Sequence, residues 1–121
     1  LKATIQSARM LFSNMPITGI FQPHLFSRTR DFQNEFADAL SLLDHCILMP
    51  IYPARELPIP GVSSEALLEW VKAPQKQIMS AAQILQFLNT QKSGVFITLG
   101  AGDIGNLAAP ITAQFKAQIQ L

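Results

Sequence analysis

The sequence has few charged residues and almost no net charge. Charged side chains make up 14% of its 121 residues, and nine Lys and Arg against eight Asp and Glu give a net charge of +1. A chain so nearly neutral has no overall electrostatic attraction for nucleic acid or for an anionic membrane, so we expect neither as a partner. Any site for an anion must therefore be local.

Cysteine and long apolar runs are also scarce. The lone Cys46 cannot form an intrachain disulfide, and His24 and His45 do not form a metal-ligand pattern with it, so a reducing, cytosolic setting is expected. No apolar run approaches the roughly 18 to 20 residues of a membrane span. The chain starts with Leu1 rather than Met, so we expect further residues upstream.

Hydrophobic residues, at 49%, are abundant enough for a core. A chain of this length buries roughly two thirds of the surface that it exposes when unfolded. Residues 1–121 are therefore predicted to form a single globular domain that needs no disulfide or structural zinc.

Helix-like and strand-like patterns alternate along the chain. Apolar residues recur at helical spacing in residues 1–13, 28–43, 64–71, 81–88 and from 103 onward, with Ser27, Ser63 and Ser80 as predicted N-caps. Strand-like runs occupy residues 17–21, 45–52, 77–79 and 95–99. This alternation predicts a three-layer α/β domain with a mainly parallel sheet covered on both faces.

The loops that follow the strands are the expected ligand sites, because parallel sheets bind ligands at the carboxyl ends of their strands. One such loop precedes Arg28 and Arg30, which are predicted in the first turn of a helix. The helix dipole disfavours cations there by up to about 1 kcal/mol each. A bound carboxylate or phosphate would relieve this, with His24 as a donor or proton carrier. The alternative is that both arginines point into water.

The second such loop, residues 52–61, contains three prolines after Tyr52 and is predicted to be stiff. Its Arg55 and Glu56 are expected to form a solvated pair, with contact to a neighbouring domain as the alternative. Trp70 lies at helical spacing and is predicted to be part of the core.

The third loop contains a glycine-rich motif formed by Gly100, Gly102, Asp103 and Gly105. A dinucleotide is not expected here, because the motif follows the last strand and no acidic residue occurs after Asp103. Two interpretations remain: a tight turn that packs closely against the sheet, or backbone N–H groups presented to an anion.

Three segments together, FQPHLFSRTRD at 21–31, YPARELPIPG at 52–61 and LGAGDIG at 99–105, resemble the C-terminal domain of the Mur ligases. The first two are specific to the branch of that family that joins L-alanine to UDP-N-acetylmuramate in bacterial peptidoglycan synthesis. The resemblance implies a Rossmann-like fold and an ATP-dependent ligase of the bacterial cytoplasm.

In that family, separate domains hold the UDP-sugar and ATP with Mg²⁺, and the C-terminal domain brings the amino acid. The resemblance therefore implies that this domain alone is inactive and binds no cofactor itself. ATP phosphorylates the muramoyl carboxylate, and the amine of L-alanine attacks the acyl phosphate when the domains close.

The resemblance also assigns residues to the amino-acid site. His24 and Arg28 match family positions that line it, and Arg28 is expected to bind the alanine carboxylate. Many members carry a second arginine where this chain has Leu25, so Arg30 or a residue of another domain is expected to replace it.

A family segment that would precede Leu1 is missing. We therefore expect a sheet one strand short and self-association through its uncovered edge. The competing interpretation of the whole chain is a stand-alone anion- or nucleotide-binding α/β module.

Overall fold

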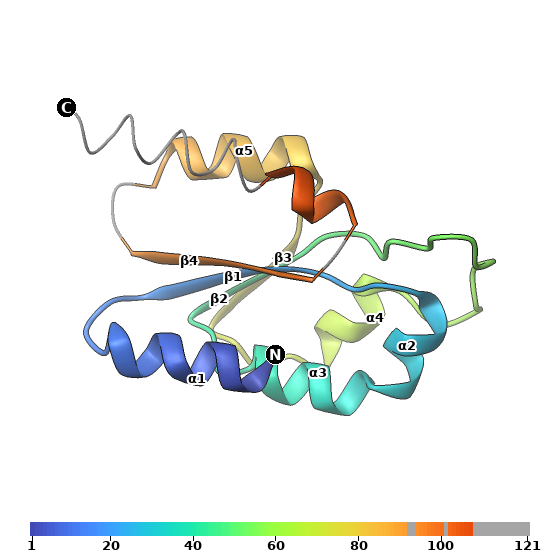
Figure 1. Ribbon diagram of the computed structural model, residues 1–121, viewed down its shortest axis with the longest axis horizontal. Coiled ribbons are helices and arrows are strands. Elements are labelled where there is room, and N and C mark those ends of the chain that lie inside the picture. The colour runs from blue at the N-terminus through green and yellow to red at the C-terminus, as the bar shows by residue number, and fades with distance from the viewer. Residues whose placement is uncertain (92–93, 101, 108–121) are drawn as a thin grey trace.

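The computed structural model describes residues 1–91, 94–100 and 102–107. They form a parallel four-stranded sheet with the order β3-β2-β1-β4. The strands are β1 (Ile17–Gln22), β2 (His45–Leu48), β3 (Gln75–Ile78) and β4 (Val95–Gly100). Helices lie on both faces of this sheet (Figure 1), which confirms the predicted α/β fold.

Four helices cover one face of the sheet and one helix, with a 3-10 helix, covers the other (Figure 1). The first layer contains α1 (Lys2–Leu11), α2 (Phe26–Asp31), α3 (Gln33–Leu40) and α4 (Ser64–Glu69). The second contains α5 (Ala81–Asn89) and the 3-10 helix at Asp103–Leu107.

Strand β1 is buried along its whole length because both of its neighbours are strands and both of its faces are covered. Ile17 and Phe21 contribute to the core under the first layer, and Ile20 contributes to the core under α5. Successive side chains of a strand point to opposite faces, so this one strand serves two cores. Its carboxyl end is consequently held rigidly, which matters for the loop that follows.

Two predicted helix starts are confirmed. The Ser63 hydroxyl accepts a hydrogen bond from the Ala66 N–H at 3.0 Å, which caps α4. Ser80 and Gln83 form a reciprocal capping box at the start of α5. Both caps use partners three residues away, and such local pairs are visible in a sequence.

The predicted helix at 28–43 is wrong in two respects. It is divided into α2 and α3 at Phe32, and α2 begins after Leu25, whose φ is 70°. Ser27 therefore lies inside α2 and is not its N-cap. The backbone turn at Leu25, which the serine pattern did not reveal, sets the helix start.

One other expectation fails, and another is tested only in its first residues. Trp70, predicted as core, is 59% exposed, because it follows the last residue of the short α4. The predicted helix from Asp103 begins as a 3-10 helix, and the rest of it, in residues 108–121, lies outside the described residues. Within the described ranges, no helix has the length and apolar character to span a membrane.

Candidate functional site

A cavity of about 460 Å³ opens at the carboxyl ends of β1 and β4. Its polar lining comes from Thr4, Gln22, His24 and Arg28. Its apolar wall includes Phe21, Phe36 and Leu99. The cavity thus lies at the edge of the sheet where parallel α/β folds bind ligands.

Arg28 is the cation of this cavity. Its Cζ lies 5.3 Å from the ring centroid of Phe32, a cation–π geometry that supports the side chain from one side. The part of the chain that the structure describes gives Arg28 no carboxylate partner. Its planar guanidinium is therefore available to bind a carboxylate through two N–H groups.

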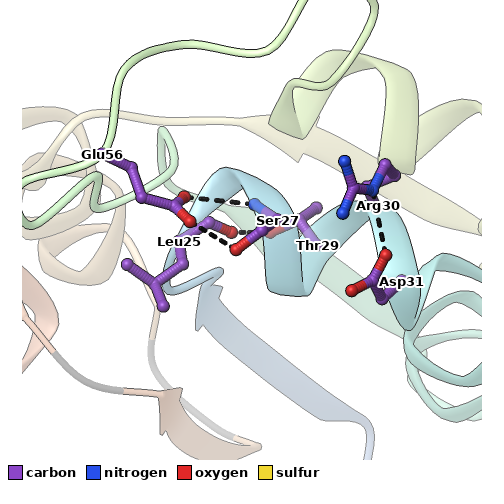
Figure 2. A network of polar contacts seen from close by, with 6 residues as sticks. All are labelled: Leu25, Ser27, Thr29, Arg30, Asp31 and Glu56. Carbon is purple, nitrogen blue, oxygen red and sulfur yellow. Dashed lines mark hydrogen bonds and ion pairs between the residues drawn. The ribbon is translucent and has the colours of Figure 1, made fainter.

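Arg30 lies differently. Its Nε is 2.9 Å from Asp31 Oδ1, and both side chains are more than half exposed. Figure 2 shows this pair at the end of α2 away from Glu56, and Arg30 does not line the cavity. Arg28 and Arg30 both lie in the last turn of the six-residue α2, so the expected conflict with the helix dipole is wrong.

The start of α2 binds a carboxylate of the chain itself. Glu56 accepts hydrogen bonds from the Ser27 N–H, at 3.1 Å, and from the Ser27 hydroxyl (Figure 2). These bonds hold the pKa of the Glu56 carboxyl below its usual value. The expected solvated pair of Arg55 and Glu56 is therefore wrong, and the Ser27 N–H is not left for an external anion.

The three segments singled out in the sequence meet around Tyr52. The Tyr52 N–H donates to Pro23 O and the Leu25 N–H donates to Tyr52 O, each at 2.8 Å. The Tyr52 ring stacks on the His24 ring, with centroids 5.8 Å apart. At Gly102, a Cβ atom would lie only 2.5 Å from Tyr52 Cγ. Sequence reasoning did not assign Tyr52 a role, because its partners are distant along the chain.

Gln22 joins the ends of three chain segments. Gln22 is 1% exposed, and its Nε2 donates to Pro50 O at 3.1 Å. Its Oε1 accepts from the Ile104 N–H at 2.9 Å, and Asp103 Oδ2 lies 3.4 Å from Nε2. The sequence signal for this role is a polar residue at the end of an apolar strand.

The contacts of the glycine motif favour the packing interpretation. Gly100 has φ +110°, and a Cβ there would lie 2.5 Å from Gln22 O. The Ile104 N–H is bonded to Gln22 and the Gly105 N–H to Gly102 O. These two N–H groups are therefore satisfied within the chain.

No metal centre is built from the described side chains, which contain no group of three His, Cys, Asp or Glu residues suited to an ion. Cys46 is a free, buried cysteine. Burial raises the pKa of its thiol to about 12, so the nucleophilic thiolate is negligible at neutral pH.

Curated proteins similar to this chain include several UDP-N-acetylmuramate–L-alanine ligases, although no family model matches the chain. A UDP-N-acetylmuramate–L-alanine ligase of Porphyromonas gingivalis is 47% identical over 92% of this chain, and one of Cytophaga hutchinsonii matches equally well. The ligase of Parabacteroides distasonis is 44% identical over 99% of the chain. The chain spans about a quarter of the length of these relatives.

Proposed function

We propose that this chain, a homologue of one part of the Mur ligases, is the amino-acid-binding domain of an ATP-dependent enzyme that joins L-alanine to UDP-N-acetylmuramate in bacterial peptidoglycan synthesis. One observation carries the proposal: identity of 44–47% over nearly the whole chain with ligases of that name. The resemblance inferred from the three segments is confirmed by the same matches.

The cavity has features that an amino acid requires. Arg28 would bind the carboxylate of L-alanine through paired N–H groups, and His24 lies in the same lining as a further polar contact. The apolar wall formed by Phe21, Phe36 and Leu99 would accept the methyl group. Arg30 is the weaker candidate for a second cation, because it pairs with Asp31 outside the cavity.

The task of this domain is then to hold and orient one substrate. A carboxylate fixed by Arg28 leaves the amine of the amino acid facing out of the cavity, toward the activated acyl group carried by the rest of the enzyme. Such positioning converts a reaction between separate molecules into one within a complex, which accounts for a large part of the catalysis of such reactions.

ATP and Mg²⁺ supply the activation of the muramoyl carboxylate when they are bound. The described residues contain neither a metal-ligand group of three nor a phosphate loop, so we assign no residue of this chain to either. We propose that both bind to other parts of the full-length enzyme, and that the isolated domain is inactive.

The full-length protein tests this function directly. Purified enzyme should release ADP only when ATP, Mg²⁺, UDP-N-acetylmuramate and L-alanine are all present, and mass spectrometry should show the alanine adduct of the UDP-sugar. The isolated 121-residue chain serves as the inactive comparison. ADP release that ignores L-alanine, or a product that carries a different amino acid, would contradict the proposal.

A further inference from the structure

The loop at residues 52–61, here called the proline loop, is hydrogen-bonded to the first turn of α2 through Glu56. Glu56, in the loop, accepts one hydrogen bond from the Ser27 backbone and a second from the Ser27 hydroxyl (Figure 2). Ser27 immediately precedes Arg28, the cation of the cavity. The contact therefore joins a loop that does not line the cavity to Ser27, the chain neighbour of the cavity residue Arg28.

The turn that precedes α2 is strained. Leu25 has φ 70° and ψ 138°, a conformation that side chains other than glycine rarely adopt and that costs on the order of 1–3 kcal/mol. Such a conformation persists only where surrounding contacts hold it. Here the Leu25 N–H donates to Tyr52 O, and Leu25 O accepts from the Thr29 hydroxyl at 2.7 Å.

Helix α2 has only six residues, too few to be stable through its own hydrogen bonds. Its placement must come from contacts with the rest of the domain. At its start the Leu25 N–H donates to Tyr52 O and the Ser27 N–H donates to Glu56, and both acceptors belong to the same loop, residues 52–61.

We infer that Glu56 is a positioning residue for the amino-acid site: by holding Ser27, it fixes the start of α2 so that Arg28 presents its guanidinium to the cavity. This inference rests on the proposed function. Glu56 acts without touching the substrate, since it is not part of the cavity lining. The bonds from Ser27 hold the pKa of the Glu56 carboxyl below its usual value, so Glu56 is ionised at neutral pH and accepts both bonds.

The test uses steady-state kinetics of the full-length ligase with all three substrates. Glu56→Ala removes both acceptors and should raise the KM for L-alanine about fivefold or more. The KM values for ATP and UDP-N-acetylmuramate should stay within about twofold of wild type, because only the amino-acid site is misaligned. Ser27→Ala, which loses only the hydroxyl bond, should raise the alanine KM by a smaller factor.

Two variants separate positioning from a general effect of lost charge. Glu56→Gln retains an oxygen for the Ser27 N–H and an amide that can donate to the Ser27 hydroxyl, so it should restore the alanine KM to within about twofold of wild type. Glu69→Ala removes an exposed carboxylate of α4 and should change none of the three KM values.

Each outcome decides something different. Wild-type enzyme that lacks alanine-dependent ADP release would overturn the proposed function. With active wild type, an unchanged alanine KM in Glu56→Ala, or an equal rise of all three KM values, would overturn the role of Glu56 alone. If Glu56→Ala fails to fold, Ser27→Ala decides, and an unchanged alanine KM there overturns the inference.

Discussion

The ring of Tyr52 lies almost parallel to the ring of His24, with 14° between their planes and 5.8 Å between their centroids. Tyr52 also pairs with His24 as an isolated parallel bridge beyond the ends of β1 and β2. The Tyr52 ring also packs against Gly102, where the backbone comes so close to the ring that no side chain fits. One aromatic residue thereby connects the cavity wall to the proline loop and the glycine motif.

The first prediction concerns this close approach. Gly102→Ala places a Cβ 2.5 Å from Tyr52 Cγ in a residue whose φ is +100°, so it combines a clash with backbone strain. We expect it to lower the free energy of unfolding by about 2–4 kcal/mol, measured by urea denaturation of the chain.

Gly61→Ala is the matched control for Gly102→Ala. Gly61 also has a positive φ, +80°, but nothing lies within 4 Å of the Cβ that would be added. It should cost only the backbone strain, about 1–2 kcal/mol. Equal losses for the two variants would show that the contact with Tyr52 does not constrain Gly102.

Gln22 gives the second prediction. Gln22→Leu removes the partners of the Ile104 N–H and the Pro50 carbonyl while keeping a side chain of similar size. Buried groups that lose their partners should lower the free energy of unfolding by about 2–4 kcal/mol. The exposed Gln86→Leu, in α5, should change it by less than about 0.5 kcal/mol. Similar values for both would contradict the bridging role of Gln22.

The third prediction is a pH dependence of stability caused by His45. This residue is 8% exposed, its Nε2 lies 2.8 Å from Gln77 Nε2, and burial lowers its pKa from 6.5. The unfolded chain therefore takes up the proton first, so stability should fall as the pH drops below about 6.5 and until the lower folded pKa is passed.

His45→Gln tests this assignment, because glutamine does not titrate. Thermal unfolding between pH 5 and 8 should show a smaller decrease of Tm toward acid for the variant than for wild type. The same slope in both proteins would assign the pH dependence to other groups.

Self-association of the isolated chain is the fourth prediction. Strand β3 is an outer strand, and among the described residues its second edge pairs with no other strand. Open edges favour pairing between chains, although β3 is only four residues long and carries Lys76, which disfavours it. Light scattering should give a mass above 13.3 kDa that rises with concentration. A constant monomer mass would count against the prediction.

The elements that depend on local residues could be predicted from the sequence. The caps at Ser63 and Ser80 have partners three residues away, and the apolar runs of β1 and β2 mark buried strands. Their alternation with helices was enough to predict the parallel sheet, because crossovers between parallel strands follow few rules. Because the strands are parallel, the loops that follow them could also be predicted to lie at the same edge of the sheet.

The details of the site could not be predicted, because they depend on distant residues. Ser27 looks like an N-cap, yet its partner is Glu56, 29 residues away, and the helix starts at a strained Leu25. The glycines of the third loop are compatible in sequence with an anion site, but in the fold Gln22 lies against Gly100 and Tyr52 lies against Gly102. Which glycine makes room for which side chain is decided only by the folded chain.

Arg28 tests the central claim most directly. In the full-length ligase, Arg28→Ala should raise the KM for L-alanine about tenfold or more, because a charged pair of hydrogen bonds to the carboxylate is lost. Arg30→Ala should raise it less, and Lys72→Ala, which removes an exposed cation outside the cavity, should leave it unchanged. An alanine KM in Arg28→Ala equal to that of wild type would show that Arg28 does not bind the alanine carboxylate, which contradicts the account.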